Sequence, residues 1–170
     1  MNQSTGATSV QRFLLVLLRF SIGWHLFYQG LGKFRAVEWT ARGFLEAASG
    51  PFASLFQGIA ESPKLMAWAD FLTVWGLMVL GILLMVGLFT RVSALGGIAL
   101  LMLFYLAAPP LASEGFTVMS SEGAELYVNK TLLEALALLL VFSFPTGRMV
   151  GLDILLRHRR ESKQAASSGA

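Results

Sequence analysis

Four polar side chains interrupt the first strongly apolar stretch of the chain. They are Arg19, His25, Gln29 and Lys33, in the segment RFSIGWHLFYQGLGKF at residues 19–34. Because an α-helix turns about 100° per residue, all four lie within about a third of the helix circumference. Lipid would leave such a stripe unpaired, so the stripe must face protein or a hydrated cavity. His25 is the natural proton donor in it, because imidazole titrates near neutral pH.

Acidic partners for this stripe lie in two later apolar stretches. Lys130 and Glu134 are four residues apart and therefore share one helix face. We expect Glu134 to form a buried ion pair with Arg19, since long side chains can bridge a difference in depth. Asp70 lies near the outer end of another apolar stretch. We expect an outward-facing polar cluster above His25, made of Lys33, Gln29, Asp70 and Lys130.

These polar residues also have a purely structural interpretation. A buried Arg19–Glu134 pair can serve to fix helix register, and Lys33 can extend its amine to the membrane surface. His25 is equally consistent with a hydrogen-bonded core histidine. Intramembrane ionisable groups nevertheless favour a functional site, because they are costly to keep in lipid.

The composition predicts the elements that position these residues. Of the 170 residues, 55% are hydrophobic and 14% are charged, against about 25% charged in soluble domains. Four runs are long enough to cross a bilayer, which takes about 20 residues: 13–33, 66–89, 92–110 and 129–147. We therefore expect an all-α integral membrane four-helix bundle. In the second run Gly76, Gly81 and Gly87 favour close helix contact.

Composition also excludes several kinds of site. The chain has no cysteine, which removes disulfides, thiol catalysis and iron–sulfur clusters. Its two histidines, His25 and His158, are too far apart to suggest a metal or haem motif, so we predict no bound metal. A net charge of +3 gives no indication of nucleic-acid binding.

The segments outside the membrane carry the remaining organisation. Residues 34–65 predict two short amphipathic helices, broken at Gly50-Pro51, that lie in the interface or cover the bundle. Basic residues are more frequent on the face that holds both termini, which favours cytoplasmic termini in a bacterial or archaeal inner membrane. We expect one domain at 1–156 and a disordered basic cytoplasmic tail at 157–170.

Three stretches resemble the DoxX/DoxD family of four-helix membrane proteins: LLRFSIGWHLFYQGLGKF, GLMVLGILLMVGLFTRVSAL and NKTLLEALALLLVFSFPTGRMVGLD. The likeness covers roughly residues 12–156. DoxD members resemble the membrane subunit of thiosulfate:quinone oxidoreductase, which joins thiosulfate into tetrathionate and reduces a quinone. The resemblance therefore implies a quinone as electron acceptor and a DoxA-like subunit or another soluble redox protein as partner.

Two functions follow from these expectations. In a quinone-linked oxidoreductase His25 and Glu134 are the catalytic candidates, because quinone reduction needs proton delivery. The candidates for binding substrate or quinone are Arg19, Gln29, Lys33, Asp70 and Lys130. The alternative is a non-catalytic membrane scaffold that recruits a soluble redox partner and uses its polar centre to hold the helices together.

Overall fold

The computed structural model describes residues 8–49, 51–109, 124–125, 128–144 and 151–153. Three of the helices in this part are long and apolar enough to cross a membrane. They are α1 (Ser9–Arg35), α4 (Pro63–Val86) and α5 (Thr90–Ala107). The prediction of a helical integral membrane protein is confirmed.

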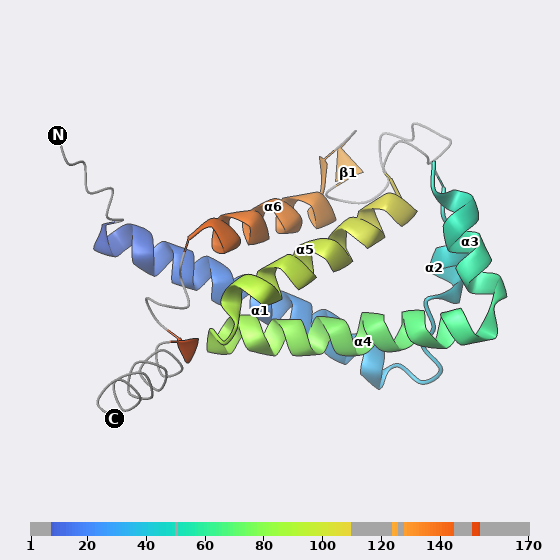
Figure 1. Ribbon diagram of the computed structural model, residues 1–170, viewed down its shortest axis with the longest axis horizontal. Helices are drawn as coiled ribbons and strands as arrows, with labels where there is room; N and C mark the ends of the chain where they lie inside the picture. Colours follow the sequence, from blue (N-terminus) through green and yellow to red (C-terminus); the bar gives the residue numbers. More distant parts are fainter. Residues whose placement is uncertain (1–7, 50, 110–123, 126–127, 145–150, 154–170) are drawn as a thin grey trace, which may run out of the picture.

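A fourth helix, α6 (Lys130–Ser143), closes the bundle (Figure 1). The helices contact one another in a ring, α1 with α4, α4 with α5, α5 with α6 and α6 with α1. The 14 residues of α6 rise about 21 Å, less than the roughly 30 Å of a hydrocarbon core. Residues 145–147, the end of the fourth expected run, lie outside the described part. A fourth crossing therefore stays a prediction.

Glycines bring α1 and α4 into backbone contact. A Cβ atom added to Gly81 would lie 2.5 Å from the backbone nitrogen of Phe27 and 2.6 Å from the carbonyl oxygen of Gly23. The expectation for Gly81 is thus confirmed. Gly76 makes ordinary contacts, and Gly87 instead ends α4 in a left-handed conformation with φ 71°. The close crossing fixes which levels of α1 and α4 face each other.

The interior of the ring is apolar. Its buried side chains come from all four helices and are Ile22, Leu26, Leu77, Leu84, Ala94, Leu100, Leu101, Ala135, Leu138 and Val141. Between helices in lipid such packing acts through van der Waals contact rather than water exclusion. Polar groups along this interior therefore need partners inside the protein.

Two short helices cover one end of the ring, α2 (Arg42–Glu46) and α3 (Ala53–Glu61) (Figure 1). Phe56 and Ala60 of α3 are buried in a second apolar cluster with Met66 of α4 and Ala107 of α5. The predicted pair of short helices is confirmed, and they pack on the ends of α4 and α5. The end of the bundle that carries α2 and α3 is called the outer end below.

A small strand pair precedes α6. β1 (Ala124–Glu125) and β2 (Val128–Asn129) are antiparallel, with Ala124 opposite Asn129. The sequence does not predict these strands, since strands of two residues carry no periodic pattern. The basic tail at 157–170 lies outside the described residues.

Candidate functional site

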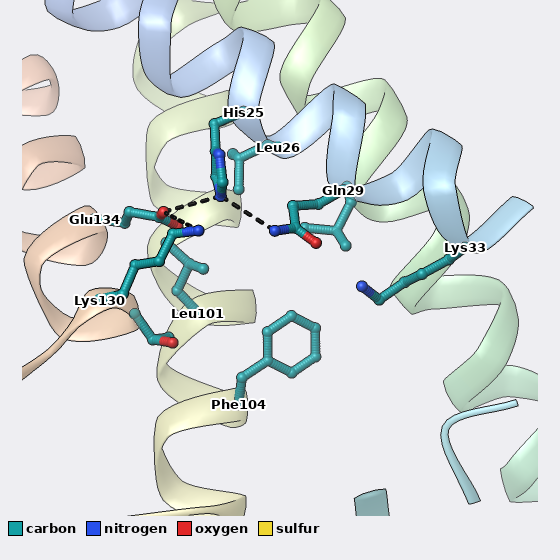
Figure 2. Close-up of a pocket in the computed structure, with 10 residues that line it drawn as sticks. His25, Leu26, Gln29, Lys33, Leu101, Phe104, Lys130 and Glu134 are labelled. Atoms are coloured by element: carbon teal, nitrogen blue, oxygen red, sulfur yellow. Dashed lines mark hydrogen bonds and ion pairs between the residues drawn. The ribbon is translucent and has the colours of Figure 1, made fainter. Parts of the chain in front are cut away.

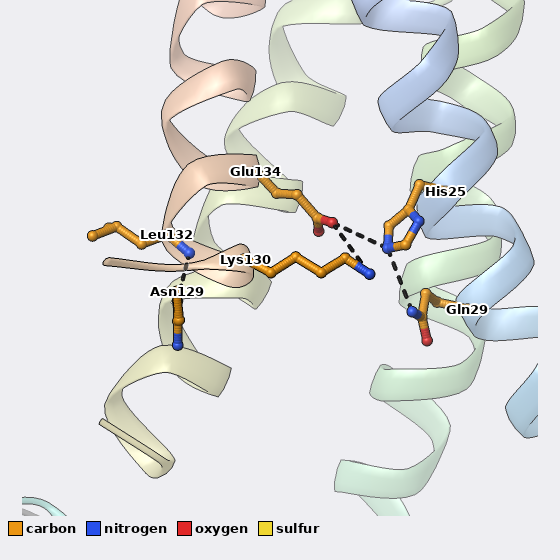
Figure 3. Close-up of polar contacts among 6 residues, drawn as sticks. All are labelled: His25, Gln29, Asn129, Lys130, Leu132 and Glu134. Carbon is orange, nitrogen blue, oxygen red and sulfur yellow. Dashed lines mark hydrogen bonds and ion pairs between the residues drawn. The ribbon is translucent and has the colours of Figure 1, made fainter. Parts of the chain in front are cut away.

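Two helices present the polar side chains of the candidate site. On α1, His25, Gln29 and Lys33 follow at intervals of four residues and therefore share one face. On α6, the side-chain oxygen of Asn129 accepts a hydrogen bond from the backbone N–H of Leu132 at 2.9 Å (Figure 3). This cap fixes the first turn of α6 and thereby the level of Glu134.

An ion pair joins the two helices. His25 Nε2 lies 3.0 Å from Glu134 Oε1, and Lys130 Nζ lies 4.0 Å from the same oxygen (Figures 2 and 3). The side chains of His25 and Glu134 are 34% and 20% exposed, so both reach open space. Within the part of the chain that the structure describes, Glu134 Oε2 has no hydrogen-bond partner. The carboxylate can therefore accept one more donor.

Gln29 constrains the proton on His25. Its amide nitrogen lies 3.4 Å from His25 Nε2, the same atom that faces Glu134. An ion pair with a carboxylate needs hydrogen on Nε2, and two donors cannot then face each other. The Gln29 NH₂ can donate to Nε2 only when this nitrogen carries no hydrogen, so the contacts of Nε2 with Gln29 and with Glu134 exclude each other as hydrogen bonds donated by Gln29 and by His25.

These side chains form one wall of a pocket of about 170 Å³ (Figure 2). The polar wall consists of His25, Gln29, Lys33, Lys130, Thr131 and Glu134. The apolar wall consists of Leu26 of α1, Leu77 of α4, and Leu101 and Phe104 of α5. We call this the inner pocket. It combines an apolar surface for a ring with a group that can give or take a proton.

Asp70 does not join this cluster, contrary to the expected outward-facing group. Its carboxylate accepts hydrogen bonds from the backbone N–H of Ala41 at 2.7 Å and from the hydroxyl of Thr40 at 3.0 Å. Because the loop after α1 folds back onto α4, these donors occupy Asp70. Its position instead borders a second pocket, of about 320 Å³, which it shares with Lys33 and Trp39. We call this the outer pocket.

The predicted Arg19–Glu134 pair is wrong. Arg19 is 2% exposed, and its guanidinium lies beside Gly87, where an added Cβ would be 3.0 Å from both terminal nitrogens. The carboxylate of Asp153 acts on it electrostatically. Arg19 lies six residues before His25, about 9 Å along the helix. It is therefore level with the turn between α4 and α5.

Sequence reasoning missed Asp153, which organises that turn. The backbone N–H groups of Phe89 and Thr90 donate to its two oxygens at 2.8 and 3.2 Å, and the Thr90 hydroxyl donates at 3.0 Å. The acid thus caps the first turn of α5. The signal in the sequence was the aspartate in GLD, the one acid of an otherwise basic C-terminal region up to residue 160.

The sequence model of the DoxX family matches residues 14–109, which is more than half of the chain. The chain belongs to the DoxX family. The DoxX match runs from α1 to the end of α5, so it includes His25, Gln29 and Lys33 but not Lys130 or Glu134. No curated protein and no solved structure matches the chain significantly.

Membership in DoxX agrees with the membrane spans and leaves the chemistry to the site. Among the described residues no group of three or more histidine, cysteine, aspartate or glutamate side chains could hold a metal ion. The arrangement is suited to proton exchange with a small ligand, since a histidine–carboxylate pair opens onto a pocket.

Proposed function

We propose that this DoxX protein is the membrane subunit of a quinone-linked oxidoreductase and that the inner pocket binds the quinone ring. The observation that carries the proposal is the 3.0 Å contact between His25 Nε2 and Glu134 Oε1 at the wall of that pocket. Reduction of a quinone takes up two electrons and two protons. A histidine held by a carboxylate can supply a proton to a carbonyl oxygen as electrons arrive.

The size of the inner pocket supports a ring-sized occupant. Its 170 Å³ is below the roughly 300–1,000 Å³ of pockets that enclose drug-sized ligands. A quinone head can contact Leu101 and Phe104 on the apolar wall, while its long tail stays outside among lipids. Gln29 and His25 are then the donors for a carbonyl oxygen.

Thiosulfate is the electron donor that we propose, oxidised to tetrathionate, on the likeness to DoxD. Two thiosulfate ions lose two electrons when their sulfur–sulfur bond forms, which balances one quinone reduced to quinol. A DoxA-like subunit or another soluble redox protein completes the enzyme. In the inner pocket Lys33 and Lys130 outnumber the one carboxylate, and this excess of positive charge favours anionic groups.

The test uses the protein in lipid nanodiscs with a water-soluble short-tailed quinone. We expect saturable binding of the quinone, measured by equilibrium dialysis, and thiosulfate-dependent quinol formation once the partner subunit is added. His25→Gln and Glu134→Gln should remove quinol formation while the protein stays folded. Absence of both binding and turnover in the wild type would overturn the proposal.

The scaffold function gives the opposite result in the same experiment. If the polar centre only holds the helices together, replacing His25 and Gln29 by leucine should leave partner recruitment and turnover intact. Co-purification of the partner measures recruitment, so loss of turnover with retained co-purification supports the quinone site.

A further inference from the structure

The outer pocket contains a cation, Lys33, that forms no ion pair among the described residues. Lys33 Nζ lies 5.6 Å above the ring of Trp39. Among the described residues no carboxylate comes within 4 Å of this amine. An ammonium over an aromatic face is held weakly compared with one in an ion pair, and lysine is flexible. Lys33 is therefore available to an anionic group.

The same pocket also suits a positive group. The residues that line it include four aromatic ones, Phe34, Trp39, Phe71 and Trp75, and two acids, Glu38 and Asp70. Thr40 and Ala41 donate to the Asp70 carboxylate, which leaves Glu38 as the acid without a hydrogen-bonded partner among the described residues. Trp75 packs against Phe34 and Phe71 with ring centroids 5.7 and 6.4 Å apart. Aromatic faces beside a carboxylate attract organic ammonium groups. The Lys33 amine over Trp39 already demonstrates that a cation is accepted at this ring.

The loop that completes the pocket is held in a strained conformation. Glu38 has φ 60°, a left-handed backbone conformation that residues other than glycine rarely adopt. It lies between α1 and Trp39, and both Glu38 and Trp39 line the pocket. Strain of this kind persists where surrounding structure imposes it, and it concentrates at ligand sites.

The position of the outer pocket favours a membrane lipid as its ligand. It lies where α1, a candidate span, ends at Arg35, and a helix long enough to cross the bilayer would bring this end near the membrane surface. Phe34 and Phe71, which line it, are 57% and 55% exposed. Acyl chains can lie against these rings while a headgroup enters the pocket.

We propose that the outer pocket binds the headgroup of a zwitterionic phospholipid. The lipid ammonium takes the place over Trp39 and beside Glu38, and Lys33 turns to pair with the phosphate. The single cation and the aromatic, acidic wall thus meet the two charges of one headgroup. This site is distinct from the inner pocket, although Lys33 borders both.

The test labels the protein with 5-fluorotryptophan and records ¹⁹F spectra in neutral detergent. The chain has four tryptophans, and tryptophan-to-phenylalanine variants assign their signals. Dihexanoyl phosphatidylethanolamine is titrated against dihexanoyl phosphatidylglycerol and free phosphoethanolamine. We expect saturable shifts of Trp39 and Trp75 with the first lipid, and at least tenfold weaker binding of the other two probes. Trp24 and Trp68, 53% and 69% exposed, report general lipid contact and should not shift.

Variants separate the outer pocket from general lipid binding. Lys33→Gln should weaken phosphatidylethanolamine binding about tenfold, because a charge-assisted hydrogen bond to phosphate is lost. Lys64→Gln removes the same charge outside both pockets and should leave affinity unchanged. Glu38→Gln, on the loop after α1, is a second variant and should also weaken phosphatidylethanolamine binding, because it removes the negative charge proposed to face the lipid ammonium.

Three results would each overturn the proposal. Parallel shifts of all four tryptophans would mean a general lipid layer. Equal affinity for phosphatidylglycerol would mean a simple anion site at Lys33. Equal affinity for free phosphoethanolamine would mean a site for a soluble metabolite. Quinone binding in the inner pocket is measured separately, so failure of either site is distinguishable.

Discussion

Two polar clusters in this bundle each contain an acid, and they differ in how completely the carboxylate is hydrogen-bonded. At the turn between α4 and α5, both oxygens of Asp153 are occupied by three donors from Phe89 and Thr90, and Arg19 beside it is 2% exposed. Near the outer end, Glu134 keeps one oxygen without a partner in the described chain, and its histidine opens onto a pocket. We call the group of Asp153 and Arg19 the closed cluster and the group of His25, Lys130 and Glu134 the open cluster. A closed cluster holds helices together, whereas an open one can bind a ligand and exchange protons with it.

The largest expected effect is a loss of activity when the open cluster is changed. Glu134→Gln and His25→Gln should lower quinone reduction by about 10²-fold or more, the usual contribution of a positioned acid–base group. Thermal stability should change little, because both side chains are partly exposed. Turnover and thermal unfolding of the same preparations measure both effects. Loss of folding in either variant would mean that the open cluster is structural.

The second prediction removes the acid of the closed cluster. Asp153→Asn should destabilise the protein by about 1–3 kcal/mol, because one carboxylate oxygen becomes an NH₂ group that cannot accept from the donors of Phe89 or Thr90. Turnover per folded molecule should stay near the wild-type value. Unfolding in a denaturing detergent measures the change. Arg19→Met combined with Asp153→Asn should cost less than the sum of the two single variants, because the two charges interact.

Sequence patterns predicted the faces of the helices better than their partners. The stripe on α1 and the Lys130–Glu134 spacing are local, so helix geometry alone determined them. The choice between Arg19 and His25 as partner of Glu134 depends on how far α1 is offset along its neighbours. The close contact of Gly23 with Gly81 sets this offset. No periodic pattern in a single sequence gives the size of the offset.

Asp70 and Asp153 also show that sequence patterns do not predict hydrogen-bond partners. Asp70 was assigned to the polar cluster because its depth matched, yet Thr40 and Ala41 reach it first. Asp153 was overlooked because its donors lie more than 60 residues away in sequence. Hydrogen bonds between distant segments decide which intramembrane acid stays open, and they follow from tertiary packing.

The third prediction tests how tightly the closed cluster is packed. Gly87→Ala should cost about 1–2 kcal/mol for the left-handed backbone, with a further cost because the new Cβ would lie 3.0 Å from the Arg19 guanidinium. Gly32→Ala is the matched control, since a Cβ there meets nothing within 4 Å, and it should stabilise α1 by about 0.5–1 kcal/mol. Detergent unfolding of both variants provides the comparison. Equal stability of the two would contradict tight packing around Arg19.

The smallest effect concerns the outermost member of the open cluster. Lys130 lies 4.0 Å from Glu134 with its side chain 62% exposed, so solvent screens the pair. Exposed pairs contribute about 0.2–1 kcal/mol, which corresponds to about a 1.5- to 5-fold change in rate. Lys130→Gln should therefore reduce quinone reduction only within that range, and added salt should reduce the difference from wild type. A loss near that of His25→Gln, unaffected by salt, would place the lysine among the groups that contact the ligand and extend the open cluster to the end of α6.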